Sequence, residues 1–289
     1  MSLEITVGCD PEFFVQSKKD KKLLSAHGMI KGTKAHPFKV KDGAVQVDGN
    51  ALELNINPAH TKEEFVGNIQ SVFAQMSAMV PEMDILGDVS AVTFDKDYFD
   101  ALPDEARELG CDPDWNAYSE SKNAIPKLPN KYLRAAGGHV HLGWLKKNVD
   151  ISDPNHFDDC VMMTKQLDWY LGLWSLSFDH DNTRRQLYGK AGAFRIKPYG
   201  MEYRVLSNQW LRSPELMGWV FDATKKAADD LYAGKYIEDT LRGRYRDNAQ
   251  FYIDNMGSRT PEYRRIGYIE SVKELVKYTG LSMPPGGEW

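Results

Sequence analysis

Alternation of apolar and polar residues predicts β-strands in the first third of the chain. In the segment EITVGCDPEFFV (4–15), one side of the alternation carries Ile5, Val7, Cys9, Phe13 and Val15, and the other carries Asp10, Glu12 and Phe14. Pro11 has no amide hydrogen, so it predicts an edge strand, a bulge or a strand end. The segment VQVDGNALELNI (45–56) alternates again, with Leu52, Leu54 and Ile56 opposite Ala51, Glu53 and Asn55. Both segments are expected to be strands.

Helical periodicity appears next, and it returns near the end of the chain. Thr61 and Glu64 form a capping-box pattern before an apolar stripe of Phe65, Ile69, Val72, Phe73, Met76 and Met79. A second helix is predicted over 156–178. The last 75 or so residues are expected to be helical, with starts at Ser213-Pro214-Glu215 and Thr260-Pro261-Glu262 and ends at Gly234 and Gly280.

The middle of the chain is richer in Pro, Asp, Asn and Gly. Residues 98–134 are predicted to be a long ordered loop. A strand follows with the segment AAGGHVHLGW (135–144), and GMEYRVLSN (200–208) is predicted to be another. No linker, repeat or low-complexity stretch interrupts the chain. We therefore expect one α+β domain over residues 1–289, with a helical C-terminal part at about 213–289.

Composition narrows the class of protein. The 289 residues are 42% hydrophobic and 27% charged, with a net charge of −5 and no long basic run, so neither nucleic acid nor a membrane is an expected partner. No apolar stretch approaches the roughly 18 residues that cross a bilayer. The N-terminus lacks a signal-peptide pattern. Three cysteines without metal-type spacing predict reduced thiols and a cytoplasmic location.

Four predicted strands present polar groups at the two-residue spacing that shares a sheet face. They carry Asp10 and Glu12, Glu53 beside Asn55, His139 and His141, and Glu202 and Arg204. Each pair alone has a simpler interpretation: a polar pair on a sheet face for the histidines, an ion pair for Glu202 and Arg204, and a turn for Asp10-Pro11-Glu12. Converging carboxylates repel unless a cation neutralises them, and carboxylates with one or two imidazoles suit Mg²⁺ or Mn²⁺. Together the four segments predict a divalent metal site.

The order of four motifs gives the chain a resemblance to a known family. The segments GCDPEFF, VDGNALELNINPA, GGHVHLGW and RRQLYGKAGAFRIKPYGMEYRVLSN resemble those of the carboxylate–amine ligases in the glutamine synthetase and γ-glutamylcysteine ligase superfamily. The narrower resemblance is to the phage-encoded carboxylate–amine ligases of type 2, over about residues 5–210. It implies a glutamine synthetase-like catalytic domain, with a mostly antiparallel curved sheet flanked by helices. Two features depart from glutamine synthetase: the first acidic pair is Asp-x-Glu, and the second strand has one clear acid.

The resemblance also implies roles for individual residues. The metal ligands it implies are Asp10, Glu12, Glu53, His139 and Glu202, with Asp48 a weaker candidate. His141 matches a histidine beside the phosphates, and Arg204 matches the arginine that faces the reacting phosphoryl group. The cationic segment that neutralises the triphosphate corresponds to Arg184, Arg185, Lys190 and Arg195, and Arg195 is also placed with the catalytic residues. The glycines before His139 allow a small substrate to approach the backbone closely.

The implied activity is an ATP- and Mg²⁺-dependent ligation of a carboxylate and an amine through an acyl phosphate. The acid is a small molecule or a peptide, the amine is open, and a homo-oligomer is compatible with the superfamily. If the protein is phage-encoded, its location is the host cytoplasm. Three alternatives stay open: a degenerate protein that binds a nucleotide or amino acid, a metal-dependent hydrolase with His139 and His141 as zinc ligands, and a guanidine-type phosphotransferase. The loop 110–123, with Asp112, Asp114 and Asn116, is either the source of a general base or a rigid lid.

Overall fold

Short antiparallel strands form two larger sheets and one small one. The computed structural model describes residues 4–107, 113–145, 147–241, 249–256, 260 and 262–288. The first sheet has the order β1 (Thr6–Cys9), β12 (Val140–Gly143), β14 (Gly200–Tyr203), β13 (Ala193–Lys197), β9 (Trp115–Asn116) and β10 (Ser121–Lys122). The second has the order β3 (Leu23–Leu24), β2 (Glu12–Ser17), β6 (Ala51–Ile56), β5 (Gly43–Asp48) and β4 (Phe38–Val40), and β7 (Met83–Leu86) also pairs with β2. Strands β8 (Ala91–Thr93) and β11 (Leu133–Ala135) form the small sheet.

The chain passes from the first sheet to the second at Pro11. Strand β1 pairs with β12, whereas β2, which begins at Glu12, pairs with β6. Asp10 and Glu12 still donate their amide hydrogens to one segment, at His139 O (3.4 Å) and Gly137 O (2.9 Å). Pro11 has no hydrogen to donate and lies between the two ladders. Of the three predicted possibilities for Pro11, the strand end is the correct one.

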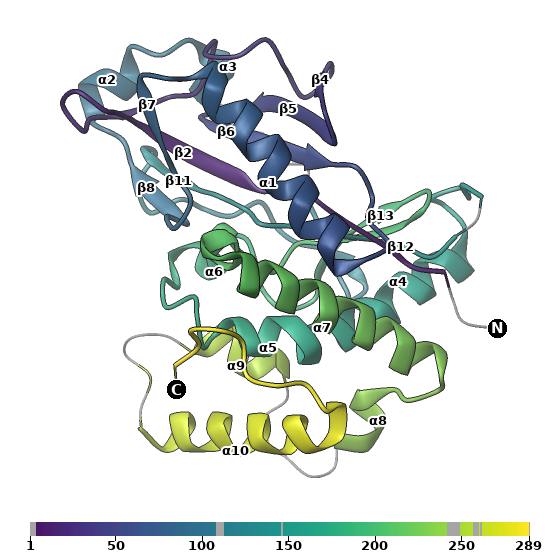
Figure 1. Ribbon diagram of the computed structural model, residues 1–289. Coiled ribbons are helices and arrows are strands. Elements are labelled where there is room, and N and C mark those ends of the chain that lie inside the picture. Colours follow the sequence, from purple (N-terminus) through teal and green to yellow (C-terminus); the bar gives the residue numbers. More distant parts are fainter. Residues whose placement is uncertain are drawn as a thin grey trace.

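Helix α1 (Lys62–Met79) joins the second sheet to the helical part of the molecule (Figure 1). The Thr61 hydroxyl accepts a hydrogen bond from Glu64 N at 3.2 Å, which confirms the predicted cap. The Glu64 carboxylate accepts from His60 N rather than from Thr61 N. Phe65 is fully buried and lies 5.9 Å from the ring of Trp210 and 5.6 Å from that of Phe221, measured between centroids. The apolar stripe therefore packs as its periodicity predicted.

The predicted helix at 156–178 is a composite. It consists of α4 (Pro154–Leu167), a π-helical turn at Asp168–Gly172 and α5 (Leu173–Ser175). The remaining helices are α6 (Thr183–Leu187), a 3-10 turn at Asn208–Arg212, α7 (Pro214–Tyr232), α8 (Ile237–Leu241), α9 (Ala249–Asn255) and α10 (Glu262–Thr279). In Figure 1, α7, α9 and α10 lie below the sheets. The helical C-terminal part is confirmed over these described residues.

Predicted helix boundaries are confirmed at three positions. Ser213 caps α7 through a hydrogen bond from Leu216 N (3.2 Å), with Pro214 in the first turn. Gly234 and Gly280 follow α7 and α10 with φ angles of 76° and 71°. Helix α10 begins at Glu262, and Pro261 lies outside the described residues.

The prediction of a long loop over 98–134 is wrong. This segment contains part of α2 (Lys96–Asp100), together with α3 (Asp104–Arg107), β9, β10 and β11. Each element has two to five residues, too few to show a periodicity. Strands β9 and β11 form because distant partners, β13 and β8, supply their hydrogen bonds.

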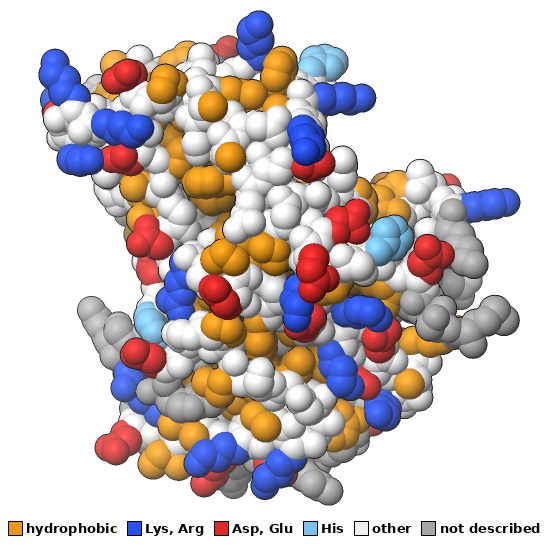
Figure 2. All heavy atoms as spheres, in the orientation of Figure 1, with side chains coloured by type: hydrophobic (Ala, Val, Ile, Leu, Met, Phe, Trp, Pro, Cys, Tyr) orange, Lys and Arg blue, Asp and Glu red, His pale blue; other side chains and the backbone are white. Residues whose placement is uncertain are grey.

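The fold class predicted from the sequence, α+β with mainly antiparallel sheets flanked by helices, is confirmed. One large apolar core runs from Ile5, just before β1, to Leu281 after α10 and includes residues of both larger sheets. Cys9 and Cys160 are buried free thiols, and Cys111 lies outside the described residues. Among the described residues, none of the helices has the length and apolar composition that crossing a membrane requires. Basic and acidic side chains are interspersed on the face seen in Figure 2.

Candidate active site

Strand register aligns most of the predicted polar residues in two rows. In the first sheet, Glu202 on β14 lies opposite His141 on β12 and Arg195 on β13. In the second sheet, Glu53 on β6 lies opposite Glu12 on β2 and Gln46 on β5. Directly opposed residues of antiparallel strands point to the same face. The two rows meet where the chain passes from β1 to β2.

The first row ends in a group of four residues, Asp10, His139, His141 and Glu202, which we call the histidine cluster. Asp10 lies within ion-pair distance of both imidazoles: Oδ1 lies 3.1 Å from His139 Nδ1, and Oδ2 lies 3.1 Å from His141 Nε2. His139 Nδ1 is also 3.5 Å from Glu202 Oε1. Ligand atoms of Asp10, His141 and Glu202 lie within 4.8 Å of one another, close enough to hold one cation. The resemblance placed His141 among the catalytic residues, and the sequence treated it as a metal ligand in the hydrolase alternative alone.

The second row ends in Glu12, Asp48 and Glu53, which we call the carboxylate cluster. One oxygen from each lies within 4.8 Å of the other two. Glu12 Oε2 accepts from Gly137 N at 2.6 Å, and Glu53 Oε2 accepts from Gln46 Nε2 at 2.9 Å. Asp48 closes the cluster because the hairpin turn at Gly49 and Asn50 places the end of β5 beside the start of β6.

The charges of the histidine cluster compensate one another. Burial opposes ionisation of Asp10, but His141 and His139 outweigh it and hold the pKa of Asp10 well below its usual value. Burial, followed by the charge of Arg204, lowers the pKa of His139 to about 4. Burial acts in the same direction on His141, yet Asp10 raises its pKa overall. Burial and Asp10 raise the pKa of Glu202, but Arg204 and the two histidines lower it by more. The pKa of Glu202 is therefore below its usual value. A neutral His139 beside ionised acids is a suitable metal ligand.

The carboxylate cluster lacks such compensation. Burial and then Asp48 raise the pKa of Glu12 to about 7, and burial with the surrounding acids raises that of Glu53 well above its usual value. Lys34 pairs with Asp48 at 3.1 Å, but no described Lys or Arg side chain forms an ion pair with Glu12 or Glu53. A bound divalent cation removes this repulsion, since hard cations prefer carboxylate oxygens. The donor set therefore fits Mg²⁺ or Mn²⁺.

Guanidinium groups border both clusters. Arg204 pairs through Nε with Asp114 at 2.7 Å and through Nη1 with Glu202. Arg184 is 3% exposed, and its Nη2 lies 3.3 Å from His139 Nε2. Burial lowers its pKa to about 10, so the side chain remains a cation at neutral pH. Arg195 lies farther out, 3.5 Å from Asp114 and 3.9 Å from Glu202. Arg184, Arg195 and Arg204 thus lie beside the clusters, and the roles that the resemblance implies for them stay predictions.

Two predicted cations lie elsewhere. Arg185 is buried against Asp179, with a 3.0 Å ion pair and a 2.9 Å hydrogen bond to its backbone oxygen. Asp179 also accepts from Ser207, so this pair ties α6 to the segment after β14. Lys190 borders a separate cavity, described below. Lys197, which the sequence did not single out, lies 2.7 Å from Glu202 Oε2. Its signal was the two-residue spacing from Arg195 on the same strand.

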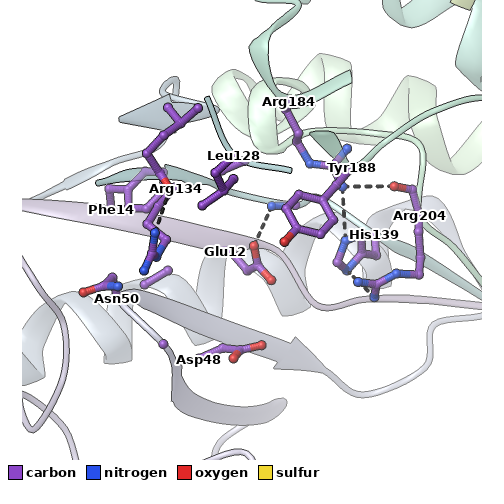
Figure 3. Close-up of a pocket in the computed structure, with 15 residues that line it drawn as sticks. Glu12, Phe14, Asp48, Asn50, Leu128, Arg134, His139, Arg184, Tyr188 and Arg204 are labelled. Atoms are coloured by element: carbon purple, nitrogen blue, oxygen red, sulfur yellow. Dashed lines mark hydrogen bonds between the residues drawn. The ribbon is translucent and has the colours of Figure 1, made fainter. Parts of the chain in front are cut away.

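Two cavities open beside the clusters and share Tyr188 as a wall. The first, the arginine cavity, opens to solvent and has about 670 Å³ of empty space, the solvent at its mouth included. Figure 3 shows Glu12 at its middle, with Arg184, His139 and Arg204 at one end and Arg134 and Asn50 at the other. The second, the loop cavity, has about 990 Å³ of empty space by the same measure and is lined by residues 113–114, 123–127, 186–190 and 193.

The predicted loop supplies one acid to this region. Asp114 lines the loop cavity and contacts Arg204 and Arg195, and burial raises its pKa despite both arginines. Asn116 in β9 donates to Ala191 O at 3.2 Å and so supports the segment that carries Lys190. Asp112 lies outside the described residues. Acids for two cations, arginines for anionic oxygens and two adjoining cavities are the elements that transfer of a phosphoryl group requires.

Comparison with known proteins agrees with the motifs. Residues 130–255 match the family described as "Phage phiEco32-like COOH.NH2 ligase-type 2", a range that includes His139, His141, Glu202 and Arg204. This match confirms the resemblance to the type 2 ligases. A solved structure titled "Crystal structure of novel glutamine synthase homolog" is similar over 97% of this chain and 69% of the other, with 12% identity and a TM-score of 0.36. Comparison with curated proteins finds no match.

Proposed function

On the premise that this chain resembles the type 2 carboxylate–amine ligases, we propose that it joins a carboxylate to an amine at the expense of ATP, with Mg²⁺ or Mn²⁺, through an acyl phosphate. One observation carries the proposal: two acidic clusters are linked through Asp10 and Glu12, which lie on either side of Pro11, with buried arginines beside both. A zinc hydrolase has no use for these arginines.

The reaction has two steps. A carboxylate oxygen of the acid attacks the γ-phosphorus of ATP, and the bond to the bridging oxygen breaks to release ADP. The amine nitrogen then attacks the acyl carbon, the carbon–oxygen bond breaks, and phosphate leaves. The nitrogen loses a proton in this step, and Asp114 is our candidate acceptor.

The side chains of this protein act mainly through position and charge. The histidine and carboxylate clusters would each hold a divalent ion, and bound ions supply positive charge to the β- and γ-phosphates. Arg204 and Arg184 lie where they can stabilise negative charge on the equatorial oxygens. Tyr188 separates the two cavities, and we assign the acid to the arginine cavity and the nucleotide to the loop cavity beside Lys190.

Hydroxylamine capture tests this function. An acyl phosphate reacts with hydroxylamine, so incubation with ATP, Mg²⁺, hydroxylamine and a panel of acids should yield ADP and a hydroxamate. Glu12→Gln and Glu202→Gln should abolish both products, whereas Glu82→Gln on the exposed surface should not change them.

The other outcomes separate the rival functions. A hydrolase leaves ATP unchanged, a guanidine kinase forms ADP without hydroxamate, and a binding protein forms neither. Hydroxamate that persists in Glu12→Gln protein would contradict the assigned metal site.

A further inference from the structure

Arg134 is a buried cation that has no acidic partner among the residues that the structure describes. Its side chain lines the arginine cavity and is 8% exposed. Nη1 donates to Lys131 O (2.9 Å) and Leu133 O (2.8 Å), and Nη2 donates to Arg107 O (2.5 Å). The guanidinium carbon lies 4.6 Å from the centre of the Phe99 ring. These contacts hold the group in place and leave its charge uncompensated by any carboxylate of the described residues.

One edge of this guanidinium is open. Within the described part of the chain, Nε is buried and has no hydrogen-bond partner, and Nη2 has two hydrogens but one acceptor. Nε and Nη2 form the edge that binds a carboxylate side-on with two parallel hydrogen bonds. A buried donor without a partner destabilises the fold, so the open hydrogens of Nε and Nη2 indicate that a ligand atom accepts from them.

Asn50 provides a second open group beside Arg134. Asn50 Nδ2 donates to Ala106 O (2.6 Å), next in sequence to the carbonyl that Arg134 binds at the end of α3. The amide is 3% exposed, and its Oδ1 has no hydrogen-bond partner in the described ranges. The Nδ2 contact fixes the orientation of the amide, so Oδ1 is the free atom and can only accept. The two residues together offer a donor edge and an acceptor.

These two residues lie at the end of the cavity away from the phosphoryl-binding arginines. In Figure 3, Glu12 lies between them and the group of Arg184, His139 and Arg204. Apolar side chains, among them Phe14 and Leu128, line the space between the two ends. An acid that reacts beside Glu12 would extend toward Arg134.

We propose that Arg134 and Asn50 select an acid substrate with a second carboxylate that carries an N–H donor beside it, at a distance from the reacting carboxylate. Arg134 binds the second carboxylate side-on, and Asn50 Oδ1 accepts from the neighbouring nitrogen, which is either an ammonium or a peptide amide. This inference rests on the proposed function, because that function determines which carboxylate reacts.

The test compares substrates and variants together. The hydroxylamine assay is run with dicarboxylic acids that carry a nitrogen beside the second carboxylate, with the same acids lacking that nitrogen, and with matched analogues that have a carboxamide instead of the second carboxylate. Loss of a bidentate charge-assisted pair should lower kcat/KM about 100-fold, mainly through KM, in Arg134→Gln. The carboxamide analogue should show the same low kcat/KM in wild type and variant. Removing the nitrogen should cost the wild type about tenfold.

Arg212→Gln is the matched control. Arg212 also donates to backbone oxygens, at Phe178 O (3.2 Å) and Gly286 O (2.8 Å), and lies over an aromatic ring, but it lines neither cavity at the site. Its replacement should leave the preference for dicarboxylic acids unchanged. An Arg134→Gln protein that loses kcat/KM equally for the dicarboxylic acid and its carboxamide analogue would overturn the proposal.

Calorimetry separates this inference from the function itself. Binding of each acid is measured in wild type and Arg134→Gln, with Mg²⁺ and a non-hydrolysable ATP analogue. If the dicarboxylic acid binds in a way that depends on Arg134 but no acid yields a hydroxamate, the Arg134 site is supported and the ligase function is contradicted. If acids are turned over without a preference for a second carboxylate, the ligase function is supported and the Arg134 site is contradicted. A peptide C-terminus that outperforms the free amino acid identifies the nitrogen as an amide.

Discussion

At the scale of single residues, the site contains buried charges that destabilise the fold on their own and become favourable when a ligand of opposite charge binds. Arg204 has two acidic partners, whereas Arg184 and Arg134 donate to backbone oxygens and have no carboxylate among the described residues within ion-pair distance. The carboxylate cluster presents the converse, because Glu12 and Glu53 form no ion pair with a Lys or Arg of the described residues. Such groups destabilise a fold in isolation, so they mark positions where the sequence serves binding.

Arg204→Lys should separate catalysis from binding. Lysine keeps the charge but cannot bridge Asp114, Glu202 and His139 with a planar group. We expect kcat to fall about 100-fold while nucleotide affinity changes by less than about threefold, because the lost contact is made to the transferring phosphoryl group. Steady-state ADP release and calorimetry with an ATP analogue measure the two effects. An equal loss of nucleotide affinity would assign Arg204 to ground-state binding.

Glu53→Gln should have opposite effects on stability and on metal affinity. Because the pKa of Glu53 is raised in the folded state, its contribution to stability is lost as the pH rises above the unfolded value. At neutral pH the metal-free variant should therefore be more stable than the wild type, by roughly 1–3 kcal/mol. Added Mn²⁺ should stabilise the wild type more, because the variant lacks a charged ligand. Thermal unfolding with chelator and with Mn²⁺ measures both effects, and a variant less stable under both conditions would contradict this assignment.

At the scale of elements, the π-helical turn at Asp168–Gly172 directs a buried acid toward the site. Asp168 accepts from Tyr203 Oη at 2.6 Å and from Gly192 N at 2.7 Å. Tyr203 follows Glu202 in β14, and Gly192 precedes β13, so one side chain connects the helix to two strands of the first sheet. Burial raises the pKa of Asp168 to about 8.

Asp168→Asn should flatten the dependence of stability on pH. The unfolded chain releases this proton near pH 4 and the folded chain near pH 8, so the wild type loses stability as the pH rises between these values. Between about pH 5.5 and 8.5 the loss from this residue should be roughly 3 kcal/mol. Asparagine can keep both hydrogen bonds and does not ionise. Urea denaturation at the two pH values measures the difference, with Asp158→Asn on the exposed face of α4 as control.

Periodicity predicted the elements that have enough residues to show it. Helices α1 and α7 and the strands around Glu12, Glu53, His139 and Glu202 were predicted because buried residues recur at fixed spacing. Strands β9 and β11 have two and three residues, and their formation depends on partners far along the chain. The site at Arg134 and Asn50 could not be predicted either, because it also depends on distant segments. Contacts with α3 determine which atoms of the two side chains are left open. The pairing of Asp48 with Glu12 and Glu53 also arises only in three dimensions.

At the scale of the whole molecule, the candidate site depends on segments that are distant in sequence. The family match covers 130–255, but Asp10, Glu12, Asp48 and Glu53 belong to the N-terminal strands and the turn between them. The apolar core includes these strands and the C-terminal helices. Tyr268 of α10 donates to Leu173 O at 3.1 Å, and Glu288 N donates to Ser177 O at 2.7 Å, so hydrogen bonds join the C-terminal part to the rest.

Unfolding should therefore be a single transition, as one domain over 1–289 predicts. Phe65→Ala removes a fully buried ring between α1, Trp210 and Phe221 and should cost about 3–5 kcal/mol. Calorimetry should show one peak that moves as a whole. Ile266→Ala, at a residue 51% exposed on α10, should change stability little. Two peaks, of which only one moves, would indicate separate folding units.

The passage between sheets at Pro11 limits how far apart the backbones of Asp10 and Glu12 can be, and so keeps the two proposed cation sites close together. Asp10 serves one cluster and Glu12 the other, and a span of two residues cannot exceed about 7 Å along the chain. The covalent backbone thus acts as a spacer of limited length between Asp10 and Glu12, independently of the conformation of the surrounding loops. Sequence drift can lengthen the turns elsewhere, but one residue inserted beside Pro11 would uncouple the two halves of the site and leave each sheet intact.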